Sequence, residues 1–218
     1  PLPLISPLAP RVAMGGFPIM SKARSPRPAN RPSRRHEILE AAIDLLAAQP
    51  PDEIAVSDIA AHCGMTPAAF YYHFTSKDEI LDEIVAGFAD RWALEVSGAL
   101  GEVAHQDDLQ NFVDRILTWV EDRDRAARVY FVTSVGATSS CEATRRRTRN
   151  DLARKASRTL KDLLPESDRI KSAISGLALI TLLEVVARTR LEVDGSYQTL
   201  GAVRFRASAG QLAEALLN

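Results

Sequence analysis

From Ser33 onward the apolar residues recur every three to four positions, which is the spacing of one face of an α-helix. No segment shows the sustained alternation between hairpin turns that is typical of strands. The pattern therefore predicts an all-α protein. The expected helices cover residues 34–48, 57–63, 67–73 and 76–100, then one that begins after Asp107-Asp108, and finally 125–136, 140–164, 168–192 and one ending near Leu217.

Residues with the chemistry of helix caps lie where several of these helices should begin. Ser33 precedes the first helix, which should stop before Pro50-Pro51. Ser76 and Glu79 have the spacing of a capping box, in which each side chain accepts a hydrogen bond from the other residue's backbone N–H. Ser139-Ser140-Cys141-Glu142 repeats this pattern and predicts the start of the helix over 140–164.

The stretch VSDIAAHCGMTPAAFYYHFT, residues 56–75, has the signals of two short helices joined by a tight turn. Gly64 ends the first helix, because glycine tolerates the positive φ of such a turn. Thr66 then caps the second helix, with Pro67 at its first position. The small side chain of Ala60 lets the two helices cross closely. This arrangement is a helix-turn-helix, and its second helix would face a DNA major groove.

Residues 38–81 resemble the N-terminal segment of the TetR family of transcriptional regulators. The resemblance is carried by Phe70-Tyr71-Tyr72-His73-Phe74-x-Ser76-Lys77-x-Glu79-Ile80-Leu81, which follows the family's order of an aliphatic residue, Tyr, a variable residue, His and Phe, then Ser-Lys-x-x-Leu. Ala69 departs from the family, in which a hydroxyl or small polar residue is common two places before the Tyr, so some DNA contacts could differ. The resemblance implies an N-terminal three-helix DNA-binding domain, residues 33–80, and a C-terminal helical ligand-binding and dimerisation domain, residues 81–218.

Carried over position by position, the resemblance implies two kinds of DNA contact. Phosphate contacts would come from Thr66, Tyr71, His73 and Lys77, and base-edge contacts from Ala68 and Tyr72. Hydroxyls, an imidazole and an ammonium suit phosphate oxygens, whereas an alanine methyl can contact a thymine methyl. Structural alternatives stay open: His73 could be a core histidine, Tyr71 could cover the edge of the core, and Lys77 could be a solvated residue at a helix start.

Residues 1–32 hold eight of the twelve prolines in the chain. Such a composition cannot bury enough apolar surface to fold, so we expect a disordered arm. The net charge of the chain is −1, yet residues 1–35 carry seven basic side chains and no acidic one. The arm could enter a minor groove or be a solvated tail, and Arg34 and Arg35 could contact phosphates or serve solubility. Met20-Ser21-Lys22 resembles a translation start, so residues 1–19 could be non-native.

The helix over residues 168–192 is apolar nearly all round, as expected of a helix buried between a domain core and a partner. We expect it to form a two-fold homodimer together with the last helix, which implies a palindromic operator. Its most apolar part, Ala173–Ala187, is shorter than a membrane-spanning helix and contains Glu184, so we expect no membrane span. Only Cys63 and Cys141 are present and no secretory leader is recognisable, which favours the cytoplasm.

A ligand pocket would lie among the helices that follow residue 81. The helix over 140–164 turns Arg145, and either Thr148 or Arg149, to its inward face. A buried arginine needs an anionic or acceptor-rich partner. That partner could be a ligand, or Asp90 or Glu95 as an internal acid, and we favour the internal acid. The candidate pocket residues are Asp90, Trp92, Trp119, Tyr130, Arg145, Thr148 and Arg149, with Phe131 as a further wall. Aromatic residues at this spacing are more often core.

The sequence contains no motif that supports catalysis. The four histidines are scattered, and no Cys or His spacing typical of a metal site and no Gly-rich phosphate loop is present. His62 and Cys63 are adjacent on a helix, so their side chains diverge. We therefore expect no enzyme, no metal and no cofactor. The prediction is a repressor that binds a palindromic operator as a homodimer and is released by a small-molecule inducer; the alternative is a DNA-binding regulator without such a ligand.

Overall fold

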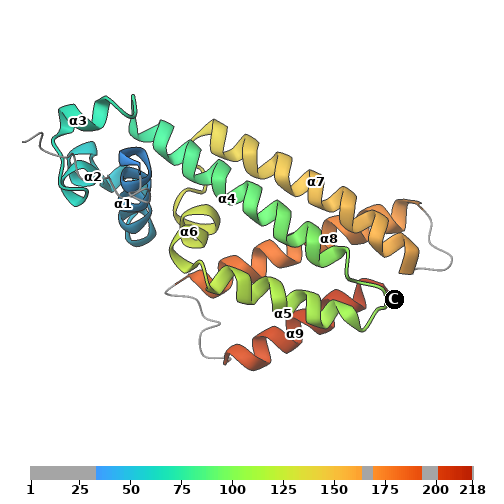
Figure 1. Ribbon diagram of the computed structural model, residues 1–218. Coiled ribbons are helices and arrows are strands. Elements are labelled where there is room, and N and C mark those ends of the chain that lie inside the picture. The colour runs from blue at the N-terminus through green and yellow to red at the C-terminus, as the bar shows by residue number, and fades with distance from the viewer. Residues whose placement is uncertain (1–32, 164–168, 193–200, 218) are drawn as a thin grey trace, which may run out of the picture. The chain divides into compact units, whose positions relative to one another are not determined.

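A computed structural model describes residues 33–163, 169–192 and 201–217, all within one compact unit that begins at Pro32 (Figure 1). Its helices are α1 (Arg34–Ala48), the 3-10 turn η1 (Pro51–Glu53), α2 (Val56–His62), α3 (Pro67–Tyr71), α4 (Lys77–Leu100), α5 (Asp108–Glu121), α6 (Asp124–Arg128), the π turn η2 (Val129–Thr133), α7 (Ser139–Leu163), α8 (Arg169–Leu191) and α9 (Ala202–Ala215). No described residue lies in a strand, so the all-α prediction is confirmed. The expectations for the basic arm, residues 1–32, lie outside the described residues.

The first three helices begin and end for the local reasons that the sequence predicted. Ser33 caps α1 by accepting a hydrogen bond from the His36 N–H at 3.2 Å. Gly64 has a φ of +65° and joins α2 to α3. Thr66 caps α3 by accepting from the Ala69 N–H, also at 3.2 Å. The two short helices and their turn are therefore defined by residues within the motif itself.

The capping box predicted at the start of α4 is only half right. Ser76 does accept a hydrogen bond from the Glu79 N–H, at 3.1 Å. The Glu79 carboxylate, however, accepts from the backbone N–H and the hydroxyl of Thr75, both at 2.7 Å, and not from Ser76. The carboxylate therefore holds the residue before the cap.

The capping residue of α7 is Thr138, so the prediction that assigned this role to Ser139 is wrong. The Thr138 hydroxyl oxygen accepts a hydrogen bond from the Cys141 N–H at 3.0 Å. The same hydroxyl donates to Asp82 of α4 at 2.7 Å. The hydrogen bond to Asp82 thus favours Thr138 over the adjacent Ser139 as the capping residue.

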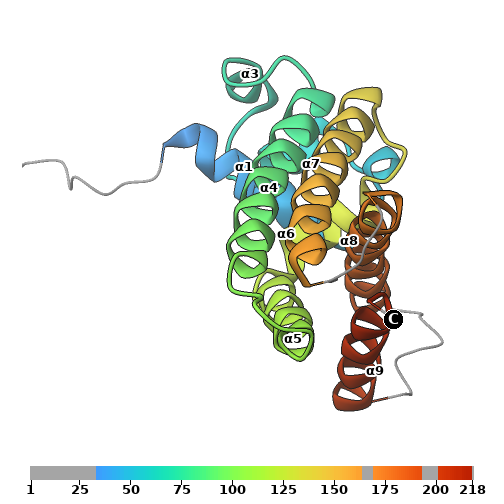
Figure 2. The ribbon, with the colours of Figure 1, turned by 90° about the vertical axis from the view of Figure 1, so that its right-hand side faces the viewer.

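Behind the helix-turn-helix, α7 lies along both α4 and α8, and α9 packs against α5 (Figures 1 and 2). The approach of α7 to α8 is closest at Gly176, where an added Cβ would lie 2.5 Å from the Ser157 backbone nitrogen. No larger residue fits there without moving a helix. This close packing makes α7 and α8 one layer of the body.

The single helix predicted over residues 125–136 is divided in the structure. After α6 the chain widens into η2, where the Ser134 N–H donates to the Val129 carbonyl, five residues back, at 3.1 Å. The helix has ended by Ser134, and a turn leads to α7. A π turn is uncommon in proteins and is frequent at functional sites.

By length and composition, α8 is the one helix among the described residues that could cross a membrane. A core helix of a folded protein has the same properties, and the inner face of α8 is buried, with Leu179 and Leu183 fully covered. Its outer face exposes Ile174, Leu177 and Val185. The sequence predicted that this helix is buried nearly all round. The described residues of the chain bury its inner face only.

Candidate nucleic-acid interface and ligand cavity

The outward face of α3 presents two tyrosines that the fold leaves exposed. Tyr72 is 86% exposed and Tyr71 is 55% exposed, while Phe70 and Phe74 are fully buried on either side of them. The buried phenylalanines fix the orientation of α3, so the exposed tyrosines point away from the core. Tyr71 also packs edge-on against Phe70, with ring centroids 5.5 Å apart.

The other residues assigned to DNA by the resemblance lie on or beside this face. Thr66 and Ala68 are exposed at the start of α3. His73 is half-buried, and its ring meets the edge of the Tyr72 ring at a centroid distance of 5.1 Å. Its side chain is therefore not that of a core histidine. The structure brings these residues together on one surface, while their contacts with DNA stay a prediction.

Lys77 is not a solvated residue at a helix start, as one alternative proposed. Its ammonium group donates to the carbonyl oxygens of Pro51 and Ile54, the second at 2.7 Å. Lys77 therefore ties the loop around η1 to the first turn of α4. A phosphate contact by the same nitrogen would use its remaining N–H group or require it to leave one carbonyl.

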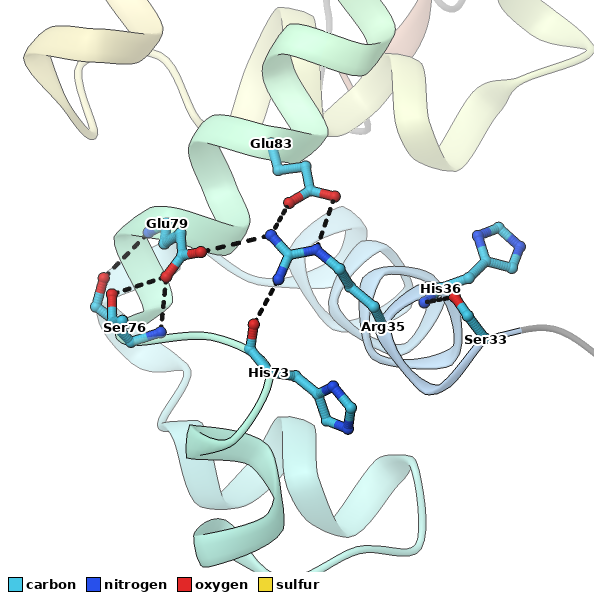
Figure 3. A network of polar contacts seen from close by, with 8 residues as sticks. Ser33, Arg35, His36, His73, Ser76, Glu79 and Glu83 are labelled. Atoms are coloured by element: carbon cyan, nitrogen blue, oxygen red, sulfur yellow. Dashed lines mark hydrogen bonds and ion pairs between the residues drawn. The ribbon is translucent and has the colours of Figure 1, made fainter.

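Arg35 joins α1 to the end of the helix-turn-helix and to α4, a role that the sequence analysis missed (Figure 3). Its guanidinium group donates to the carbonyl oxygen of His73 and forms ion pairs with Glu83 and Glu79. It also lies over the Phe74 ring, 3.9 Å from the centroid. The hydrogen bond with Glu83 raises the pKa of Arg35. Arg35 is thus a structural residue, and neither a free phosphate contact nor a solubility residue.

The helix-turn-helix region is acidic apart from these two tied cations and Arg34. Residues 33–80 contain three basic and eight acidic side chains. Arg34 forms an ion pair with Glu37 at 2.7 Å. The five basic side chains in residues 1–32 are therefore a large part of the positive charge near this end of the chain.

A cavity of about 240 Å³ lies between η2, α7 and α8. Its lining residues are Tyr130, Phe131, Val135, Glu142, Arg145, Arg149, Thr181, Glu184, Val185 and Arg188. Three of the seven predicted pocket residues are among them. The sequence analysis missed the α8 side of the cavity, because a single sequence does not show which face of α8 meets α7.

Arg145 is buried, as predicted, but the prediction that Asp90 or Glu95 pairs with it is wrong. Its guanidinium group donates to Glu142 at 2.6 Å, to the Tyr130 carbonyl at 3.0 Å and to the Ser134 hydroxyl. Asp90 is exposed on α4, so it neither pairs with Arg145 nor lines the cavity. The partner is an acid one turn earlier on α7, because that acid lies three residues away on the same face.

Glu95, the other acid considered for Arg145, accepts a hydrogen bond from Arg115 at 2.9 Å instead. Arg115 belongs to α5 and also pairs with Glu102 at 2.7 Å. Through Arg115, these two acids link α4 and the turn after it to α5.

Arg149 and Thr148 both turn partly inward and are half-buried. Arg149 donates through Nε to Glu184 of α8 at 2.6 Å. Burial of the Glu184 carboxylate raises its pKa, and Arg149 opposes that rise. This ion pair bridges the two helices at the wall of the cavity.

Tyr130 is buried with its hydroxyl lacking a normal hydrogen bond to any described residue. Burial is the main cause that raises the pKa of this phenol, and the charge of Glu184 adds to it. The Thr148 side chain opposes the rise only weakly. The phenol is thus a neutral donor that makes no hydrogen bond of normal geometry and has only a weak contact with Thr148.

Trp92 and Trp119 do not line the cavity, so the structure does not bring them to the predicted pocket. Trp92 is fully buried, and its ring meets Phe131 edge-on at a centroid distance of 5.3 Å. Trp119 lies beneath the guanidinium group of Arg123, 4.4 Å from the ring centroid. Both tryptophans fill the core between α4, α5 and η2, which was the structural alternative for these residues.

In the ranges that the structure describes, no group of three His, Cys, Asp or Glu side chains could hold a metal ion. The features that remain are an exposed recognition face and a donor-rich cavity.

A model of the family of bacterial regulatory proteins named for TetR matches residues 38–84, which run from α1 into α4. The DNA-binding segment of the chain therefore matches the TetR family. The matched region holds the helix-turn-helix and its exposed tyrosines. The region that matches is the one on which the resemblance rested.

Curated relatives match the chain over its N-terminal part. The transcriptional repressor KstR2 of Mycobacterium tuberculosis is 41% identical over 58 residues, which are 27% of this chain and 29% of that protein. The nucleoid occlusion factor SlmA of Marinobacter nauticus is 38% identical over 55 residues, 25% of this chain and 28% of that protein. The matches therefore span less than a third of these relatives.

Solved structures match most of the chain at low identity. A transcriptional regulator from Rhodococcus sp. Rha1 has a TM-score of 0.68 and 18% identity, covering 85% of this chain and 96% of that one. The regulator FadR of Bacillus subtilis, solved with stearoyl-CoA, has a TM-score of 0.64 and 14% identity, covering 84% and 97%. These likenesses show that the body shares the TetR fold.

Proposed function

We propose that this TetR-family chain is a transcriptional repressor that binds a palindromic operator as a homodimer in the bacterial cytoplasm and is released by a small molecule. The observation that carries the proposal is the pair of exposed tyrosines on α3, held outward by buried Phe70 and Phe74. An exposed aromatic pair on a capped recognition helix suits contact with a DNA groove. The name of the KstR2 relatives supports repression.

Within this proposal, the residues around α3 divide into phosphate contacts and base contacts. Thr66 uses its oxygen to accept from the Ala69 N–H, so its hydroxyl proton remains available for a phosphate. Tyr71, His73 and Lys77 would be further phosphate donors. Tyr72 and Ala68 would face base edges. The exposure of Tyr72, greater than that of Tyr71, supports its assignment to the deeper contact.

The proposed homodimer uses the outer face of α8 together with α9. That face exposes Ile174 and Leu177, and α9 exposes Val203 and Leu212. Large apolar side chains exposed on both helices are what a protein interface would cover. A two-fold axis through this surface would place two α3 helices against successive major grooves, about 34–36 Å apart. The division into a DNA-binding domain, residues 33–80, and a ligand-binding and dimerisation domain, residues 81–218, is part of the same proposal.

α4 would transmit ligand binding to α3. It has neither proline nor glycine before Gly87, so its first ten residues are a continuous helix. Arg35 fastens these turns to the carbonyl of His73, and Asp82 fastens them to the start of α7. A ligand that displaced α7 would therefore tilt α4 and change the separation of the recognition helices. Typical coupling of this kind amounts to about 5–150-fold in affinity.

The experiment is selection of duplexes from a random pool by the full chain, followed by titration of the selected duplex and of point variants of it. Tyr72→Ala should change the ranking of those variants, because a base contact is lost. Tyr71→Ala, the matched control on the same helix, should weaken all duplexes to a similar degree. Equal loss on every duplex for Tyr72→Ala would refute its base-facing role, and selection of no duplex would refute the function.

A further inference from the structure

The cavity between η2, α7 and α8 has more free donors than free acceptors. Its two acids are already engaged: Glu142 accepts from Arg145 and from the Gly136 N–H, and Glu184 accepts from Arg149. The buried Tyr130 phenol makes no hydrogen bond of normal geometry with a described residue and has only a weak contact with Thr148. A molecule that binds here should therefore bring acceptor atoms.

Two arginines at the cavity carry spare terminal amino groups. Arg149 uses only Nε, for Glu184, and Arg188 uses only Nε, for Glu192 at 2.6 Å. Their terminal nitrogens have no partner in the ranges that the structure describes. The flat end of a guanidinium group matches the two oxygens of a carboxylate. With three arginines and two acids in its lining, the cavity is also net positive.

The size of the cavity limits what can enter. A volume of about 240 Å³ lies below the roughly 300–1,000 Å³ of pockets for drug-sized ligands. The remaining walls are apolar, from Phe131, Val135 and Val185. Behind Phe131 the interior is filled by Trp92, so no channel for a long chain continues inward.

We propose that this cavity binds a compact organic anion, a small carboxylate with a short apolar or aromatic body. The carboxylate is received by the terminal nitrogens of Arg149 and Arg188 and by the Tyr130 phenol, and the apolar body lies against Phe131 and Val185. Arg145 lines the cavity but does not bind the anion, because its donors are already used in hydrogen bonds that hold the turn after η2. The inference rests on the proposed ligand-controlled function and names the class of ligand.

A larger hollow of about 480 Å³ lies between Pro50–Asp52, the start of α4 and Val135–Ala137. Its cation, Lys77, is held by two carbonyl oxygens, so it offers less to an anion than the Arg149 and Arg188 pair does. Side-chain variants separate the two sites in the experiment below.

The test uses benzoate, phenylacetate and hexanoate, each compared with its neutral primary amide, in calorimetric titration and thermal unfolding of the full chain. At least one carboxylate should bind saturably and raise the unfolding temperature, and its amide should do neither. Arg188→Gln should weaken that binding about 10-fold or more, the usual effect of losing a hydrogen bond to a charged group. Tyr130→Phe should weaken it without loss of folding, because the phenol makes no hydrogen bond of normal geometry with a described residue.

The matched control is Arg154→Gln, since Arg154 is an exposed arginine of α7 paired only with nearby Asp151. It should leave carboxylate binding unchanged. Amides that bind as well as acids, binding that ignores both cavity variants, or no binding of any of the three acids would overturn the proposal. Operator binding is measured on the same samples without ligand, so its presence or absence tests the proposed function separately.

Discussion

Arg145→Met should destabilise the protein strongly, because it removes a buried cation that holds the turn between η2 and α7. The side chain is 7% exposed and makes three hydrogen bonds, to the Tyr130 carbonyl, the Ser134 hydroxyl and Glu142. Methionine fills a similar length without a donor. The buried carbonyl then loses its partner, and the turn loses its tie to α7.

The size of the effect follows from these contacts. A hydrogen bond to a charged group is worth about 1.5–3 kcal/mol, and removing one partner of a buried ion pair costs about 3–5 kcal/mol. Glu142 is 43% exposed, so water recovers part of that loss, and its second partner, the Gly136 N–H, remains. We expect a loss of about 3 kcal/mol in the free energy of unfolding. For a chain of this length that corresponds to a fall of about 6–12 °C in Tm.

The assay is urea unfolding of both proteins at one protein concentration, since the stability of a dimer depends on concentration. Arg147→Met is the matched control, because Arg147 lies on the exposed face of the same helix. It should change the free energy of unfolding by less than about 0.5 kcal/mol. A loss below about 1 kcal/mol for Arg145→Met, or one equal to that of the control, would refute the structural role assigned here.

Two further variants or labels test the packing. Gly176→Ala should lower the free energy of unfolding by about 1–3 kcal/mol, because its Cβ would lie 2.5 Å from the Ser157 nitrogen. Gly98→Ala, the control, has open space around it and should not destabilise α4. Equal effects of the two variants in thermal unfolding would contradict the close approach of α7 and α8. Burial raises the pKa of the Cys141 thiol to about 11, so at pH 8 only about one thiol in a thousand is ionised and iodoacetamide should label it only after unfolding. Mass spectrometry would detect this, and native labelling of Cys141 as fast as that of half-buried Cys63 would contradict it.

The parts of the fold that the sequence predicted well are those that neighbouring residues determine. α1 has the predicted bounds because Ser33 and Pro50-Pro51 act within the chain around it. Gly64 and Thr66 define the turn of the helix-turn-helix in the same way. The acid that pairs with Arg145 also had a local signal, the three-residue spacing from Glu142, which the sequence analysis overlooked.

Other features depend on groups far apart along the chain and had no local signal. The contacts of Arg35 reach residues 38 to 48 positions away, and the capping of α7 by Thr138 depends on Asp82 of α4. The α8 side of the cavity depends on the pairing of α7 with α8. A single sequence does not show which of several equivalent hydroxyls or acids will be neighbours in space.

The π turn η2 also bears on how such proteins diverge. A π turn is an α-helix with one residue inserted, so deleting a single residue within Val129–Thr133 would restore ordinary helical winding. A π turn uses one more residue than an α-helical turn for nearly the same rotation, so side chains beyond the turn would keep their orientation and those within it would move to other positions. The wall of the cavity formed by Tyr130 and Phe131 would therefore be rebuilt. Insertions and deletions of one codon in this turn could therefore change which ligand a descendant of this protein recognises, while the helix-turn-helix and its target stay the same.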